Sequence, residues 1–298
     1  MESKPQKATP IFNDQFDILS SLGEGNTSKV YLARHKESGQ TTALKIFKEE
    51  FLHRSEESIS QVQSEITILS NLKHPHIVGL QGYGDKGFVK KPSGRLIENL
   101  VYVQMEHVTG GLFFDLCQLM GPMGEDTGRF FGLQMLDALE HMHGKRVAHR
   151  DLKLENILLD PYLNMKIADF GFATYKSIDQ LKSYRGTLTY MAPEVKEGKT
   201  YNGAQIDMFS FAVILFIIVH GIFPFKEARK EEYFYNLLMT GQHELYFEKV
   251  NGTNLSPEFK DLIVRLFSYD ASKRPTSSEL RDHAWFSKPG FNYEHARK

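Results

Sequence analysis

The spacing of apolar residues changes character near Val108. Before that point the apolar runs are short, as over residues 30–33 and 41–47, and a turn at 37–40 separates these two runs. Short apolar runs bounded by turn residues are typical of β-strands, and a further strand is expected over 102–105. This part of the chain is therefore predicted to form mainly a sheet.

One segment of this first part has the spacing of a helix instead. Apolar side chains recur through 58–72 at Ile59, Val62, Ile66 and Leu69. Steps of three and four residues place side chains on one face of an α-helix. We therefore expect a single helix among the strands.

Helical patterns dominate after a break in character at 109–111. Helices are expected over 127–143, 209–220 and 257–267, each with an apolar stripe or an apolar face. No internal repeat or low-complexity segment is present. Strands followed by helices predict an α+β fold with two lobes around a cleft.

Composition narrows the classes of partner and compartment. The chain has 36 basic and 37 acidic residues, a balance that gives no sign of nucleic-acid or membrane binding. The most apolar run, 211–219, is about half the length of a membrane span, so a buried helix is expected there. Cys117 is the only cysteine, which fits a reducing compartment. We expect a cytoplasmic protein, with access to the nucleus left open.

The densest group of reactive side chains lies between Asp151 and Asp169. Asp151 can accept a hydroxyl proton, and Lys153 can neutralise a migrating phosphoryl group. Asn156 and Asp169 carry the hard oxygen ligands that magnesium prefers. Together they predict chemistry on a polyphosphate that is bound with a divalent metal.

A glycine-rich stretch lies between two of the predicted strands. Gly23 and Gly25 allow a tight turn whose backbone N–H groups can approach phosphates. The stretch is not a P-loop, because the chain has no G-x-x-x-x-G-K-[ST]. A strand rather than a helix follows the glycines, so a Rossmann site is excluded as well.

These segments resemble the motifs of eukaryotic protein kinases. Residues 149–156, followed by the D-F-G at 169–171, are similar to the catalytic loop H-R-D-L-x-x-x-N and its metal-binding partner. Residues 22–30 resemble the kinase glycine-rich loop, with Ser28 in place of its third glycine. The A-L-K at 43–45 resembles the strand motif V-A-I-K.

The resemblance implies an ATP site. Lys45, held by Glu65 of the predicted helix, would position the α- and β-phosphates. Residues 105–108 resemble the hinge that meets the adenine edge, and apolar side chains would cover the faces of the ring. The residues expected to bind the nucleotide are Leu22, Gly23, Glu24, Gly25, Asn26, Thr27, Ser28, Val30, Ala43, Lys45, Glu65, Met105, Glu106, Val108 and Leu158.

Two segments are similar to serine/threonine kinases rather than tyrosine kinases. Lys153 in the catalytic loop is typical of the former class. Residues 186–194 resemble the platform that ends in A-P-E, and Thr187 matches the threonine that bridges the catalytic aspartate and lysine. The resemblance therefore implies Asp151, Lys153 and Thr187 as catalytic residues, with Asn156 and Asp169 as ligands of Mg²⁺.

Further residues are implied to have structural roles. Glu194 should form a buried ion pair with Arg274, and Asp207 should support the backbone of the catalytic loop. His74 and His76 match the kinase H-P-x-I-V loop. A metal site at these histidines is disfavoured, because no third ligand follows at a suitable spacing.

The resemblance covers residues 16–286 and is nearest to the calcium/calmodulin-dependent kinase group. It implies a bilobal protein kinase fold, with a β-rich N-lobe over 16–108, a helical C-lobe over 109–286 and the active site in the cleft. Residues 1–15 are expected to be a flexible extension, and 287–298 a short tail.

The implied activity is phosphorylation of serine and threonine hydroxyls on a protein or peptide substrate by a monomeric, ATP-dependent enzyme. Ser183 matches a regulatory phosphosite for an upstream kinase or for autophosphorylation, and its phosphate would pair with Arg150. The family usually has a second basic residue after D-F-G that also pairs with this phosphate, but Thr174 occupies that position here. Leu112 replaces the acidic residue of the family pattern G-G-E-L-F-D, so a preference for basic substrates stays open.

Two other activities remain as alternatives. A pseudokinase that serves as an ATP-binding scaffold usually lacks Lys45, Asp151 or Asp169, and all three are present. A small-molecule or lipid kinase of related fold is disfavoured by the intact A-P-E platform.

Overall fold

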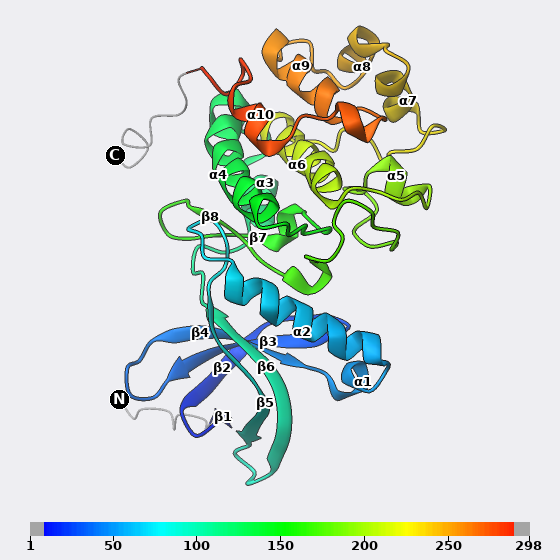
Figure 1. Cartoon of the computed structure of the whole chain (residues 1–298). Helices are drawn as coiled ribbons and strands as arrows, with labels where there is room; N and C mark the ends of the chain where they lie inside the picture. The colour runs from blue at the N-terminus through cyan, green and yellow to red at the C-terminus, as the bar shows by residue number, and fades with distance from the viewer. Residues whose placement is uncertain (1–8, 289–298) are drawn as a thin grey trace, which may run out of the picture. The chain divides into compact units, whose positions relative to one another are not determined.

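Six antiparallel strands from the first third of the chain form one sheet that closes into a barrel (Figure 1). The computed structural model describes residues 9–288. Along the barrel the strand order is β1-β2-β3-β4-β6-β5. The strands are β1 (Ile11–Phe12), β2 (Phe16–Glu24), β3 (Ser28–His35), β4 (Thr41–Phe47), β5 (Leu80–Lys90) and β6 (Leu96–Glu106).

The shortest strand, β1, closes the barrel by pairing with both β2 and β5. Phe12 is 1% exposed, and its ring meets the ring of Tyr102 edge-on at 4.8 Å. Asn13 Oδ1 accepts a hydrogen bond from the Phe88 amide at 2.8 Å. The expected flexible extension over 1–15 is therefore wrong for Ile11 and Phe12, which form a strand of the barrel. Residues 1–8 of that extension lie outside the described residues.

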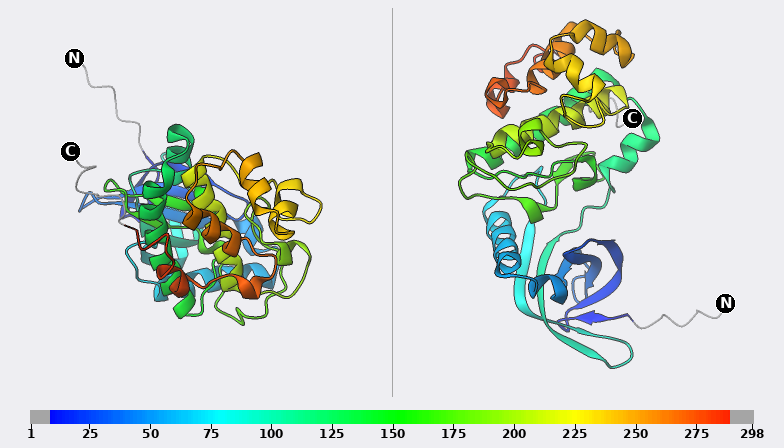
Figure 2. Two further views of the ribbon diagram at one scale, coloured as in Figure 1. Left: turned by 90° about the horizontal axis from the view of Figure 1, so that it is seen from above. Right: turned by 90° about the vertical axis from the view of Figure 1, so that its right-hand side faces the viewer.

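Two helices, α1 (Glu49–Leu52) and α2 (Glu56–Asn71), interrupt the strands. Helix α2 begins after Ser55, whose hydroxyl accepts the Ser58 amide at 3.3 Å, an N-cap that satisfies one exposed donor. It packs against β5, as the right-hand view of Figure 2 shows. The helix predicted over 58–72 is thus confirmed, with its start two residues earlier.

The second part of the chain is mainly helical. Its helices are α3 (Phe113–Met120), α4 (Gly124–Gly144), α5 (Pro193–Lys196), α6 (Gly203–His220), α7 (Tyr233–Met239), α8 (His243–Lys249), α9 (Pro257–Leu266) and α10 (Ser277–Arg281). This part also holds a small hairpin of β7 (Ile157–Leu159) and β8 (Met165–Ile167). Three short 3₁₀ turns complete it: η1 (Leu154–Asn156) before the hairpin, and η2 (Phe170–Phe172) and η3 (Ala271–Lys273) after it. Helices α4 and α6 pack side by side (Figure 1).

Helix α6 forms the centre of this helical part. Asn202 caps its start by accepting the amides of Ala204 and Gln205 at 2.9 and 3.3 Å, so the helix begins earlier than the predicted 209. Among the described residues it is the one helix long and apolar enough to cross a membrane, and 83% of its apolar window is buried inside the protein. The buried helix expected at 211–219 is confirmed.

The described chain divides into two compact units. Unit 1 holds residues 9–73 and 78–108, and unit 2 holds 74–77 and 109–288. Residues 74–77 belong to unit 2, where Ile77 pairs with Ile167 of β8. The predicted α+β class, a β-rich N-lobe with a helical C-lobe, is confirmed.

Candidate active site

In unit 1 the glycine-rich stretch is the hairpin that joins β2 to β3. The Gly25 amide donates to the Ser28 carbonyl at 2.9 Å, and Gly23 pairs with Val30 across the hairpin. A Cβ built on Gly23 or Gly25 would meet no atom within 4 Å. The backbone of this turn is therefore open to a ligand. The exposed residues of the stretch are Leu22, Gly23, Glu24, Gly25 and Asn26.

Ser28 stands at the position of the missing third glycine. It is the first residue of β3, pairs with Phe47 and is 6% exposed. Thr27 donates to its hydroxyl at 3.4 Å. The side chain is thus packed into the sheet and leaves the tip of the turn uncovered.

Lys45 and Glu65 meet inside unit 1. Lys45 Nζ lies 2.6 Å from Glu65 Oε1, and the two side chains are 7% and 2% exposed. Lys45 is on β4, where it pairs with Val30 of β3 and Val103 of β6, and Glu65 comes from α2. The ion pair is buried, so the lysine keeps its position relative to the glycine-rich hairpin.

The segment expected to meet adenine is the end of β6. Met105 pairs with Ala43, and its carbonyl accepts the Thr42 hydroxyl at 2.7 Å. The Glu106 carboxylate accepts the Gly79 amide at 2.7 Å, so its side chain holds the start of β5. Met105, Glu106 and Val108 are half-buried. Leu158, expected at the same ring, lies on β7 in unit 2.

In unit 2 the three predicted catalytic side chains form a closed triangle. Thr187 donates to Asp151 Oδ1 at 2.8 Å and accepts from Lys153 Nζ at 3.0 Å. Lys153 Nζ lies 3.1 Å from Asp151 Oδ2. Asp151 is 6% exposed, so its carboxylate is held in one orientation by the other two groups.

Asn156 and Asp169, the expected magnesium ligands, are joined through the backbone, because the Ala168 amide donates to the Asn156 carbonyl at 2.8 Å. Asn156 Nδ2 donates to the Asp151 carbonyl at 2.9 Å, which turns the side-chain oxygen away from that group. Asp169 is exposed and has φ 58°, an uncommon conformation for a non-glycine residue. A carboxylate and a carboxamide oxygen fit Mg²⁺.

Asp207 of α6 holds the backbone of the catalytic loop. Its carboxylate accepts the amides of His149 and Arg150 at 2.8 and 2.9 Å. Arg150 has φ 65°, so these bonds hold a loop that is strained at this residue. His143 Nε2 lies 3.0 Å from the same carboxylate. This contact was not expected from the sequence.

A model of the family described as "Protein kinase domain" matches residues 16–286. The chain belongs to this family. It is 35% identical to an Aurora kinase of Dictyostelium discoideum over 96% of the chain and 69% of that relative. It is 34% identical to serine/threonine-protein kinase SIK2 of Gallus gallus, over 91% of the chain and 32% of that relative. It is 33% identical to CBL-interacting protein kinase 32 of Oryza sativa subsp. japonica, over 92% of the chain and 59% of that relative.

The kinase domain is therefore of the serine/threonine type, and the expected likeness to the calcium/calmodulin-dependent kinase group is confirmed by the SIK and CBL-interacting relatives. The chain spans about a third of the length of the former relative and about three-fifths of the latter. Nothing in the site favours a pseudokinase, since Lys45, Asp151 and Asp169 are all present. Proteins of this family use ATP with Mg²⁺ and act on protein substrates.

The segment from Asp169 to Glu194, the activation segment of the kinase domain, is tied to the catalytic loop. Arg150 donates to the Ser183 hydroxyl at 2.8 Å and to the Phe172 carbonyl at 2.6 Å. The Tyr201 hydroxyl donates to the Ser183 carbonyl at 2.8 Å. Burial lowers the pKa of Arg150 from its ordinary value. The sequence indicated the pairing of Arg150 with residue 183 but not the tyrosine, which belongs to no motif.

The end of the activation segment is fixed by the ion pair of Glu194 with Arg274. Both guanidinium N–H donors lie 2.7 Å from the carboxylate oxygens. Arg274 also donates to the Ser268 carbonyl at 2.9 Å and stacks over the Phe209 ring at 4.9 Å. Arg274 is 2% exposed, so the structure brings together this expected pair in the core of the domain.

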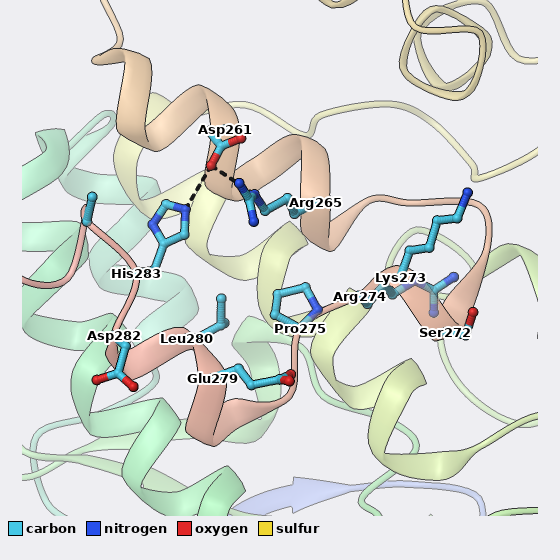
Figure 3. A pocket seen from close by; sticks show the side chains of 11 residues that line it. Asp261, Arg265, Ser272, Lys273, Arg274, Pro275, Glu279, Leu280, Asp282 and His283 are labelled. Atoms are coloured by element: carbon cyan, nitrogen blue, oxygen red, sulfur yellow. Dashed lines mark hydrogen bonds and ion pairs between the residues drawn. The ribbon is translucent and has the colours of Figure 1, made fainter.

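A wide pocket of about 590 Å³ lies among α9, η3 and α10, as Figure 3 shows. Asp261 accepts from His283 at 3.1 Å and from Arg265 at 2.9 Å, so these three side chains are partnered with each other. None of the predicted catalytic, metal or nucleotide residues lines it. This pocket is therefore separate from the chemistry of the domain.

Proposed function

We propose that Asp151, Lys153 and Thr187 transfer the γ-phosphoryl group of ATP to protein serine and threonine hydroxyls. The observation that carries this proposal is the closed triangle of these three side chains. Asp151 orients the substrate hydroxyl and accepts its proton. Lys153 supplies positive charge where negative charge spreads over the oxygens of the transferred group. Thr187 fixes both partners by donating to one and accepting from the other.

The residues of unit 1 bind and orient the nucleotide. Lys45, held by Glu65, faces the α- and β-phosphates, and the open backbone of the turn at Gly23 and Gly25 covers the phosphates. Apolar side chains of β3 and β4 cover the adenine ring. We assign to nucleotide binding the same fifteen residues that the sequence predicts.

Asn156 and Asp169 would hold Mg²⁺, which neutralises phosphate charge when bound. Their part is to place two oxygen ligands beside the catalytic base. Asn156 also donates to Asp151 Oδ2 at 3.3 Å, so the base and the ligand stabilise each other.

We further infer a monomeric protein in the cytoplasm with access to the nucleus, whose kinase domain covers 16–286. Phosphorylation at Ser183, by an upstream kinase or by the chain itself, would strengthen the contact with Arg150, because a phosphate pairs with a guanidinium more strongly than a hydroxyl does. The protein or peptide substrate carries a serine or threonine.

The experiment that tests this function identifies the residue that receives phosphate. Purified protein is incubated with Mg²⁺, γ-labelled ATP and three degenerate peptide libraries that offer serine, threonine or tyrosine as the sole acceptor. We expect label on the serine and threonine libraries. The Lys45→Met variant, prepared in parallel, controls for contaminating kinases. Label on tyrosine alone, or equal labelling by the variant, would contradict the proposal.

A further inference from the structure

The activation segment is fixed to the rest of unit 2 by bonds that need no phosphate. Near its start, the backbones of Thr174 and Ala148 exchange two hydrogen bonds of 2.9 Å. Further along, the backbones of Leu181 and Tyr201 exchange two hydrogen bonds of 2.8 Å. Tyr201 lies after the segment and shortly before α6, so it joins the middle of the segment to the chain that leads into this central helix.

The side chain of Tyr201 makes a second contact with the segment, at Ser183. Tyr201 is 4% exposed, and its hydroxyl donates to the Ser183 carbonyl at 2.8 Å and lies 3.3 Å from Ser183 Oγ. Because the single hydroxyl proton of Tyr201 is used at the carbonyl, Ser183 Oγ is the donor in the second contact. Ser183 Oγ in turn accepts from Arg150 at 2.8 Å. A continuous chain of hydrogen bonds therefore joins Arg150 to Tyr201 through Ser183.

This chain of hydrogen bonds lies next to the catalytic side chains. Arg150 directly precedes Asp151. A Cβ built on Gly186, which has φ 113°, would lie 2.8 Å from the Arg150 carbonyl. Thr187, the next residue, donates to Asp151. The short stretch from Ser183 to Thr187 thus contacts the catalytic loop at both ends and at Gly186, so a shift of Ser183 displaces Thr187 as well.

A tyrosine that only fills space in the core is the simpler alternative. Such a residue needs its ring, and its hydroxyl can be satisfied by any acceptor. The hydroxyl of Tyr201 instead contacts Ser183 twice, at the carbonyl and at the Oγ that Arg150 also contacts. The hydroxyl therefore has a partner whose position matters to the catalytic loop.

We propose that Tyr201 is a positioning residue for phosphotransfer. Its hydroxyl holds Ser183 against Arg150, and thereby holds Thr187 at Asp151, while Ser183 carries no phosphate. The kinase domain is then active before phosphorylation. A phosphate on Ser183 makes the tyrosine hydroxyl dispensable, because it pairs with Arg150 more strongly than the serine hydroxyl does. This inference rests on the function proposed above and concerns its regulation.

The test compares kcat in the wild type and in Tyr201→Phe, which keeps the ring and loses the hydroxyl. Both proteins are dephosphorylated, and intact mass confirms an unmodified Ser183 before and after the assay. At saturating ATP and peptide, kcat should fall about two- to tenfold in the variant, the effect of one neutral hydrogen bond. The KM for ATP should not change.

The matched control is Tyr246→Phe. Tyr246 is buried in α8, and its hydroxyl donates to the Pro224 carbonyl at 3.2 Å, away from the activation segment. This variant loses one buried hydroxyl as well. It should show a similar loss of stability in urea and an unchanged kcat.

A second pair of proteins separates positioning from a structural role. The wild type and Tyr201→Phe are produced with phosphoserine at position 183 by an expanded genetic code. In this form the two proteins should have the same kcat, because the phosphate supplies the contact that the variant lacks. A residue with only a structural role would lower kcat equally in both forms.

Amide hydrogen exchange tests the contact without any activity measurement. In unmodified Tyr201→Phe, exchange should be several-fold faster at the Leu181 amide, which donates to the carbonyl of residue 201, and at the Tyr190 amide, which donates to the Thr187 carbonyl. Unaltered exchange at both amides would overturn the role of the hydroxyl.

Three kinetic results would overturn the proposal. These are an unchanged kcat in unmodified Tyr201→Phe, an equal loss of kcat with and without phosphoserine, and a wild type that transfers phosphate only when Ser183 is phosphorylated. No transfer by the wild type in either form would overturn the proposed function itself, so the two failures are distinguishable.

Discussion

Both units bury a short ion pair between a basic side chain and a glutamate, and these two pairs are built differently. In unit 1 Lys45 meets Glu65 at 2.6 Å through one ammonium group. In unit 2 Arg274 meets Glu194 through two bonds of 2.7 Å and also donates to the carbonyls of Ser268 and Gln205. The two ion pairs thus have nearly the same length and burial, but one cation is an ammonium and the other a guanidinium.

The difference between ammonium and guanidinium fits a nucleotide-binding role proposed for the Lys45–Glu65 pair and a structural role for the Arg274–Glu194 pair. A guanidinium is a planar fork, and Arg274 uses it to join three segments of chain that are distant in sequence. An ammonium is a compact point charge that suits phosphate binding. Lys45 lies across from Val30, at the base of the glycine-rich hairpin. The neighbours of each pair therefore support the role proposed for it, whereas burial alone does not distinguish the two pairs.

The largest expected effect is the loss of stability in Arg274→Met. The variant leaves Glu194 buried without a counter-charge, which should lower the free energy of unfolding by about 3–5 kcal/mol. Urea denaturation measures this change. Adding Glu194→Leu removes the unpaired charge, so the double variant should recover most of the stability. If the double variant were no more stable than the single one, the pair would not be the cause.

At the other pair, the double variant Lys45→Met with Glu65→Leu should separate stability from activity. Replacing both buried charges by apolar groups of similar size is often neutral for stability. Phosphotransfer should nevertheless fall by about 10²- to 10³-fold, since a preorganised positive charge is lost from the nucleotide site. Urea denaturation and initial rates, measured on both double variants, show whether each pair contributes to stability or to activity. Full activity in this variant would make the two pairs equivalent.

A smaller effect is expected at Thr187. The Thr187→Val variant keeps the shape of the side chain and loses its bonds to Asp151 and Lys153, so kcat should fall about tenfold or more. Thr187→Ser retains the hydroxyl and should retain most of the rate. Peptide phosphorylation at saturating ATP measures both. An unchanged kcat in the valine variant would show that the triangle does not orient the base.

The smallest effect concerns pH and the stacked rings of His74 and His141, whose centroids are 5.0 Å apart. Burial lowers the pKa of both histidines. The pKa of His74 is lowered further by the positive charges of His141, His76 and Lys166, and Asp137 partly opposes this effect. Lys145 acts likewise on His141.

Because the unfolded chain then binds more protons, this contribution to stability is complete above about pH 6.5 and is lost as the pH falls below that value. Urea denaturation between pH 7.5 and 5 should show a shallower decline in the variant His74→Asn with His141→Asn. An identical slope in variant and wild type would exclude this pair as the source.

Local motifs made much of the site predictable from the sequence. Asp151, Lys153 and Thr187 lie in two short segments, and the structure brings them within hydrogen-bond distance. The pairing of Lys45 with Glu65 was implied by the resemblance to protein kinases, on a predicted strand and a predicted helix. Such features depend on residue type at fixed spacing, which a sequence displays directly.

Other features depend on distant segments and could not be predicted. Strand β1 has two residues, too few for any periodicity, and exists because Phe12 packs against Tyr102. Strand β5 was missed because Gly82, Gly84 and Gly87 interrupt its alternation. Two of these glycines are needed there, since a Cβ at position 84 would lie 2.8 Å from the Tyr102 ring and a Cβ at position 87 would lie 2.9 Å from the same ring.

The central claim is that unit 1 binds the nucleotide and that Asp151 of unit 2 performs the proton transfer. The most direct test is Asp151→Asn, measured for ATP binding and for peptide phosphorylation on the same protein sample. We predict unchanged ATP affinity and a fall in turnover of about 10²- to 10⁴-fold, the usual contribution of a general base. Turnover equal to that of the wild type, with ATP bound equally well, would contradict the assignment of Asp151 as the base.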